Sequence, residues 1–129
     1  MAVARVTLPG EFAEENTMRI RGRFLDDLGQ PIPLVGLDSL TLTLYSDATK
    51  AIINGVENTD IRNVGRGIVS DLDGTFSVKL GVDDMIILDD SLTTETHVAL
   101  IIGTYNGVPE DGFSREVVFK VRNLAKVLA

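Results

Sequence analysis

The sequence contains no cysteine and no tryptophan among its 129 residues, and it has a single histidine. The absence of cysteine excludes a disulfide framework and any thiolate-based metal or redox site. Nucleophilic catalysis also lacks its usual residues, because there is no Gly-x-Ser-x-Gly elbow and the one histidine, His97, lies within a predicted strand. We therefore expect a protein that is not an enzyme, in which His97 is a core side chain.

Long apolar runs are missing as well. No run approaches the roughly 18 residues of a membrane span, and residues 1–6 lack the basic start and continuous apolar core of a signal peptide. We expect no membrane association and synthesis in the cytoplasm. The net charge of −7 argues against non-specific nucleic-acid binding, which needs clustered Lys and Arg to neutralise phosphates.

The acidic charge is concentrated in one part of the chain. Between Lys79 and Arg115 there is no Lys or Arg, while seven acids lie there: Asp83, Asp84, Asp89, Asp90, Glu95, Glu110 and Asp111. They equal the whole net charge, since 19 acidic minus 12 basic residues also leaves seven. This acidic band is either a solvated edge or a surface that meets a basic partner.

Metal and cofactor motifs are absent or incomplete. Residues 70–74, Ser-Asp-Leu-Asp-Gly, resemble the start of a calcium loop, but the later ligands are missing and a hairpin turn explains the Asp-Gly pair. The pairs Asp83-Asp84 and Asp89-Asp90 are better suited to capping a helical turn between them. No phosphate-cradling glycine loop occurs. We predict no metal and no cofactor.

Two apolar runs near the C-terminus predict a β-hairpin. Residues 96–105 are apolar at odd and even positions, which is typical of a central strand, and residues 113–121 form a half-solvated partner. The connector 106–112 holds Asn-Gly and Asp-Gly, which supply positive-φ positions. Within it, Asn106, Gly107, Glu110 and Asp111 are candidate protein-contact residues.

The remaining pattern predicts an all-β fold. With the hairpin, the expected strands are 18–25, 39–46, 51–54, 67–70, 75–80, 96–105 and 113–121. About seven strands with almost no helix are typical of an immunoglobulin-like antiparallel β-sandwich. We expect an extended N-terminal arm over 1–17, the sandwich over 18–124 and a C-terminal tail over 125–129. The arm could cover its own sheet edge or add a strand to a neighbour's sheet.

The strand at 18–25 places three arginines on one face. Met18, Ile20, Gly22 and Phe24 alternate with Arg19, Arg21 and Arg23. The arginines either contact an acidic surface, of a neighbouring subunit or of this chain's own acidic band, or form a solvated face that opposes edge aggregation. A sugar-binding surface would need exposed aromatic rings, and only Tyr45 and Tyr105 could provide them.

The stretch 21–36, with its Asp/Gly turn and Pro-Ile-Pro-Leu-Val-Gly segment, leads into the leucine–threonine strand 40–45. It resembles the opening of small structural proteins of tailed bacteriophages and is similar to the N-terminal domain of siphophage baseplate upper proteins. Residues 95–100 and 115–124 are similar to the closing hairpin of related phage virion proteins. Baseplate proteins continue beyond the sandwich, whereas we expect no helical or receptor-binding extension here, which favours a stand-alone accessory protein.

The resemblance implies a non-enzymatic virion structural protein made in the host cytoplasm. The expected types are a neck or collar protein at the head–tail junction and a capsid decoration protein. The expected partners are other virion proteins (portal, connector, capsid or tail), contacted as a homo-oligomer or on a symmetric lattice through the arm, the tail and the charged faces. The alternative is a carbohydrate-binding or host-attachment module of the tail or baseplate.

Overall fold

The protein is an all-β sandwich of two sheets, as the sequence predicts. The computed structural model describes residues 4–25, 28–32, 37–63, 65–70, 74–89, 91–105 and 108–123. Its strands are β1 (Ala4–Ala13), β2 (Met18–Arg23), β3 (Leu37–Ser46), β4 (Thr59–Asp60), β5 (Gly67–Val69), β6 (Thr75–Leu80), β7 (Thr94–Tyr105) and β8 (Val108–Arg122). A short 3₁₀ helix, η1 (Val82–Asp84), provides one helical turn, but it contains Asp83 and Asp84 and does not lie between the two aspartate pairs as predicted.

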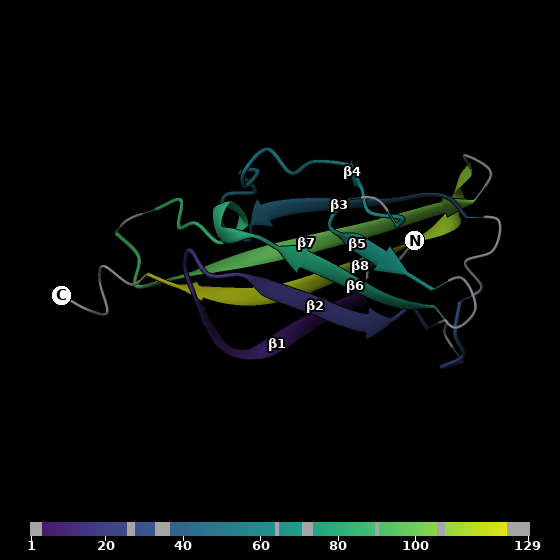
Figure 1. Ribbon diagram of the computed structural model, residues 1–129, viewed down its shortest axis with the longest axis horizontal. Helices are drawn as coiled ribbons and strands as arrows, with labels where there is room; N and C mark the ends of the chain where they lie inside the picture. The colour runs from purple at the N-terminus through teal and green to yellow at the C-terminus, as the bar shows by residue number, and fades with distance from the viewer. Residues whose placement is uncertain are drawn as a thin grey trace.

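The two sheets are unequal in size. A five-stranded sheet has the order β1-β8-β7-β3-β4, and a three-stranded sheet, β2-β6-β5, lies in front of it (Figure 1). Neighbouring strands are antiparallel except for β1 and β8, which are parallel. Most of the predicted antiparallel arrangement is therefore confirmed.

The core lies between the sheets and follows the alternation in the sequence. Leu40, Leu42 and Leu44 on β3 have no exposed surface, and Leu42 pairs with Ile101 across to β7. β7 occupies the middle of its sheet and buries residues on both faces, including Val98 and Ile101. The prediction of a central strand at 96–105 is thus confirmed.

Three phenylalanines fill the core at one end of the sandwich, and two glycines make room for them. Phe24 stacks on Phe76 at 4.4 Å between ring centroids and lies 4.9 Å from the ring of Phe113. Gly22 pairs with Phe76 and Gly103 pairs with Phe113. A Cβ atom at Gly103 would lie 2.6 Å from the Phe113 ring. Glycine is needed at both positions, because any side chain there would crowd the phenylalanine ring on the neighbouring strand.

The C-terminal hairpin is confirmed, but its connector is shorter than predicted. β8 begins at Val108, which pairs with Tyr105, so residues 108–112 belong to the strand and not to a loop. Of this stretch the register pairs Val108 with β7, and a shift of register separates that pair from the pair of Gly103 with Phe113. The turn-forming residues alone do not indicate this irregular extension of the strand. Asn106 and Gly107 lie outside the described residues, as does the tail 125–129.

β8 is also less solvated than predicted, because β1 covers its free edge. Residues 4–13 of the predicted arm form β1, and Val6 pairs with Val117. Arg5 bridges Glu116 at 2.6 Å and Asp47 at 2.9 Å, and its hydrogen bond lowers the pKa of the Asp47 carboxyl. In this chain the described part of the arm covers its own sheet edge, the first of the two alternatives.

The predicted strand at 51–54 is wrong. Only a single bridge between Tyr45 and Ile52 remains of it. Lys50, Asn54 and Gly55 have φ values of 62°, 53° and 64°, a left-handed conformation that a strand cannot accommodate. The segment instead folds as turns beside β3.

Candidate functional site

The outer face of the three-stranded sheet gathers basic side chains. On β2, Ile20 is buried in the core, whereas Arg19, Arg21 and Arg23 are exposed on the opposite face. The structure therefore brings the three predicted arginines together on one face of one strand.

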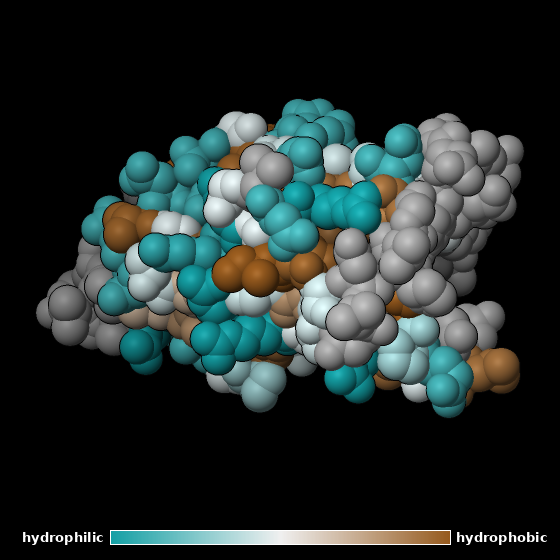
Figure 2. All heavy atoms as spheres, turned by 45° about the vertical axis from the view of Figure 1, so that its right-hand side comes forward, coloured by the Kyte–Doolittle hydropathy of each residue, from teal (hydrophilic) through white to brown (hydrophobic). Residues whose placement is uncertain are grey.

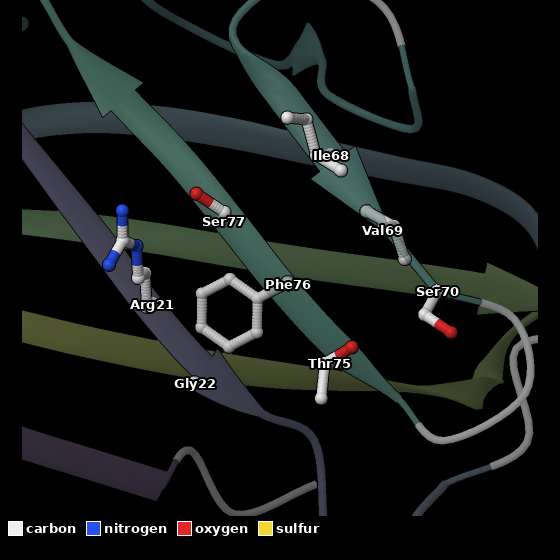
Figure 3. A pocket seen from close by; sticks show the side chains of 8 residues that line it. All are labelled: Arg21, Gly22, Ile68, Val69, Ser70, Thr75, Phe76 and Ser77. Atoms are coloured by element: carbon white, nitrogen blue, oxygen red, sulfur yellow. The ribbon is translucent and has the colours of Figure 1, made fainter.

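β6 and β5 extend this surface. Arg19 lies opposite Lys79 and Arg21 lies opposite Ser77, and the Arg19 guanidinium donates a hydrogen bond to Ser77 Oγ at 2.9 Å. In Figure 3, Ser77 on β6 lies between Arg21 on β2 and Ile68 on β5, and Ile68 is 62% exposed. We call Arg19, Arg21, Arg23 and Lys79 the basic face.

An open depression lies on the sheet beside Arg21. Its volume is about 350 Å³, and it is lined by Arg21, Gly22, Ile68, Val69, Ser70, Thr75, Phe76 and Ser77. The space-filling view shows a small apolar area in the middle of the visible surface, with hydrophilic residues above and below it (Figure 2). Such a surface offers positive charge and hydroxyl donors around a limited apolar contact.

No ion pair within the described part of the chain involves Arg19, Arg21 or Lys79 of the basic face. Arg66, which precedes β5, in contrast pairs with Asp84. Arg19 and Lys79 are directly opposite each other on neighbouring strands. Like charges in that position destabilise a sheet, so this arrangement lowers stability unless a partner supplies negative charge.

The acidic band of the sequence is not one continuous surface. Asp84 and Glu95 are only 3% and 4% exposed and serve internal contacts. Asp84 accepts hydrogen bonds from the Gly81 backbone N–H at 2.7 Å and from Asn54 Nδ2 at 3.0 Å, in addition to its pair with Arg66. Asp83 and Asp89 are exposed. Within the described residues, the band therefore meets a basic side chain of this chain at Asp84, which pairs with Arg66.

A buried Glu–His pair lies near the start of β7, at the opposite end of the sandwich from the three core phenylalanines. His97 has no exposed surface, and its Nε2 lies 2.6 Å from Glu95 Oε1. Glu95 also accepts the backbone N–H groups of Leu88 and Asp89, each at 3.0 Å. The carboxylate acceptor assigns the ring proton to Nε2, which leaves His97 Nδ1 buried without a partner.

The placement of His97 in the core is confirmed, but sequence reasoning missed its partner. Glu95 and His97 are two residues apart on one strand, so both side chains point to the same face. This spacing of two residues in the sequence could have indicated that Glu95 is the partner of His97. The pair joins β7 to the segment that follows η1, and so has a structural role in the described contacts.

The pH dependence of stability is expected to report His97. Burial lowers the pKa of His97, and the hydrogen bond with Glu95 opposes that effect only in part. The unfolded chain, with an ordinary pKa of about 6.5, then binds a proton more readily than the folded one. The stabilisation is complete above pH ~6.5, and the free energy of unfolding falls as the pH drops below it.

Urea unfolding at pH values on both sides of this window measures the effect. His97 is the only histidine, so no other side chain with an ordinary pKa titrates there. In His97→Gln, which retains an N–H donor for Glu95, the decline is expected to disappear. An equal decline in both proteins would rule out His97 as its source.

The predicted contact residues of the hairpin connector have no described side chains. Asn106 and Gly107 are not among the described residues, and Glu110 and Asp111 lie in β8 without described side chains. Tyr45 is half-buried with Lys50 Nζ over its ring at 5.4 Å from the centroid. One face of this ring is therefore covered, which gives no support to a sugar-stacking role.

Among the described residues, no group of three or more His, Cys, Asp or Glu side chains is arranged to hold a metal ion. No helix in the same residues is long and apolar enough to cross a membrane. Comparison with protein-family models, curated proteins and solved structures returns no match to this chain.

Proposed function

We propose that the chain is a non-enzymatic structural protein of a tailed-bacteriophage virion. It is an accessory assembly module at the head–tail junction, as a neck or collar protein, or on the capsid, as a decoration protein. It acts through symmetric contacts with other virion proteins, as a homo-oligomer or on a symmetric lattice. The basic face is the observation that carries this proposal.

The basic face suits docking on an acidic protein surface for a physical reason. Arg19 and Lys79 repel each other across two strands, and the described residues supply no counter-charge for either. An acidic partner would relieve this repulsion and would also orient the encounter. The exposed Ile68, opposite Ser77 on the neighbouring edge strand β5, adds an apolar contact beside the basic face.

We also propose that the sandwich is immunoglobulin-like, and the order of its strands supports this. When β1 to β8 are lettered A, B, C, C′, D, E, F and G in chain order, the sheets become A-G-F-C-C′ and B-E-D. The orders G-F-C-C′ and B-E-D are those of an immunoglobulin variable-type sandwich. The resemblance of residues 21–36 and 40–45 to small phage structural proteins supplies the virion location.

Charge reversal at Arg21 tests the docking role. Arg21→Glu is expected to lower incorporation into purified phage particles at least tenfold (~1.4 kcal/mol or more), because it places a carboxylate against an acidic partner. Lys120→Glu, on the exposed side of β8, changes the net charge equally and should be incorporated like the wild type. Incorporation is measured by mass spectrometry of particles, and the position by electron microscopy.

Two results would contradict the proposal. Particles of the encoding phage that lack this protein would exclude a virion role. Equal incorporation of Arg21→Glu and wild type, with both variants folded, would show that the basic face is not the contact. Both variants lie on exposed strand positions, where a substitution usually changes stability by less than about 0.5 kcal/mol.

A further inference from the structure

The sandwich is open along the side where β1 and β2 form the sheet edges. β1 ends the five-stranded sheet and β2 ends the three-stranded one, and the two strands run along the same side of the molecule (Figure 1). A cavity of about 150 Å³ lies between them. Its apolar lining is Val6, Leu8, Ile20, Phe24, Phe76 and Val117, and we call it the edge cavity.

The edge cavity is apolar inside and cationic at its rim. Val6 pairs with Val117, whose side chain is buried, yet Val6 itself is 57% exposed. The charged residues of its lining are Arg21, Arg23, Arg115 and Glu116, and the Glu116 carboxylate is paired with Arg5. The Arg115 guanidinium donates to two backbone carbonyls, those of Leu25 at 2.7 Å and Ser114 at 2.8 Å, so its charge meets no carboxylate in the described residues.

Among the described residues no strand pairs with the outer edge of β2, which we call its free edge, and this edge presents backbone groups beside the cavity. Phe24 N–H donates to the Gly74 carbonyl on the β6 side, and Lys79 N–H donates to the Arg66 carbonyl on the β5 side. Backbone groups alternate in direction along a strand. Arg19 and Arg21 are each an odd number of residues from Phe24. Their backbone N–H and C=O groups therefore point away from β6, toward the free edge.

We propose that the free edge of β2 binds an extended segment of a partner protein in which acidic and apolar residues alternate. The segment adds as a strand beside Arg19 and Arg21, its carboxylates lie on the basic face, and an apolar side chain enters the edge cavity. The inference rests on the proposed function, because it names the chemistry of the partner that the basic face contacts.

Strand geometry explains why the segment needs acidic residues and apolar residues in alternation. Successive side chains of a strand point to opposite faces, so a strand added to β2 has one set beside the arginines and the other beside Ile20 and Phe24. Opposite charges across neighbouring strands stabilise a sheet. A second copy pairing through its own β2 would instead place arginine beside arginine, which is destabilising. The occupant is accordingly an acidic and apolar segment of another protein.

A synthetic peptide tests the strand addition on the full chain. The probe is an acetylated and amidated Asp-Val-Asp-Leu-Asp-Val hexapeptide, titrated to millimolar concentration and followed by NMR. Binding is expected to slow hydrogen exchange at the Arg19 and Arg21 amides by about tenfold or more. A hexapeptide of the same composition with its acids and apolar residues in separate blocks is the control and should give no protection.

Two variants at Arg21 separate the backbone from the side chain. Arg21→Ala removes the charge alone, whereas Arg21→Pro also removes the outward N–H and is compatible with an edge strand. We expect Arg21→Ala to weaken peptide binding a few-fold and Arg21→Pro to abolish it. The exchange measurement on the wild type keeps the test valid if Arg21→Pro does not fold.

Each contrary outcome has a distinct meaning. No binding, binding without amide protection, or equal binding to the two Arg21 variants would overturn strand addition. Self-association without peptide, abolished by Arg21→Pro, would assign the edge to a second copy and overturn the acidic partner segment. If incorporation into particles still depends on Arg21 in any of these cases, the proposed function stands and only the mode of contact is wrong.

Discussion

Replacing Gly67 with alanine is expected to lower the free energy of unfolding by about 3 kcal/mol, the upper range for overpacking a tight core position. Gly67 is buried at the start of β5. A Cβ atom there would lie 1.9 Å from the carbonyl oxygen of Ile61. Because that obstacle is backbone and not the end of a flexible side chain, local rotation cannot relieve the contact.

Hydrogen bonds hold the obstructing carbonyl in place. The Ile61 carbonyl accepts the Asn63 N–H at 3.0 Å, and the Ile61 N–H donates to Leu40 at 3.0 Å. Moving Ile61 away from a new methyl group would strain both bonds and shift a side chain that has no exposed surface. The cost therefore includes lost hydrogen bonding as well as steric overlap.

Denaturant unfolding measures this effect as a lower midpoint with an unchanged slope. Gly81→Ala is the matched control. Gly81 has an extended backbone that alanine also adopts, and its added Cβ would lie at an ordinary 3.7 Å from Asp84. We expect a change of less than about 0.5 kcal/mol for this variant. Equal stability of the two variants would show that β5 and the Ile61 segment do not pack as described.

Local patterns predicted most strands because their buried faces follow a period of two. Leu40, Leu42 and Leu44 on β3 alternate with polar residues, and the structure buries all three. The arginines of β2 were predicted on one face for the same reason. The same approach failed for residues 51–54. Their apolar residues predict a strand, but the left-handed backbone at Asn54 and Gly55 prevents one.

The features that sequence reasoning missed depend on long-range register. Lys79 joins the basic face only because β6 places it opposite Arg19, and no local pattern specifies that pairing. The requirement for Gly67 likewise arises from Ile61, which reaches it through a turn. The edge cavity exists because β1 and β2, the edge strands of different sheets, lie on the same side of the sandwich. Such relations follow from tertiary packing and cannot be obtained from hydrophobic periodicity.

Glu95→Ala is expected to destabilise the protein by about 3 kcal/mol, because it removes the acceptor of three hydrogen bonds at once. Glu95 accepts from His97 Nε2 at 2.6 Å and from the Leu88 and Asp89 backbone N–H groups at 3.0 Å. The His97 ring would be left buried with neither nitrogen bonded, since Nδ1 already lacks a partner. A buried polar group without a partner costs about 1–3 kcal/mol.

A matched control separates this effect from the loss of a negative charge. Glu57→Ala changes the net charge equally at an exposed position and should alter stability by less than about 0.5 kcal/mol. Glu95→Gln retains one carbonyl oxygen but presents an amide NH₂ toward donors, so its stability should lie between those of Glu95→Ala and the wild type. Urea unfolding at pH 7.5 or above, where His97 is neutral, measures all three. If Glu95→Gln were as stable as the wild type, a single acceptor would suffice, and the bidentate role of the carboxylate in joining β7 to residues 88–89 would be wrong.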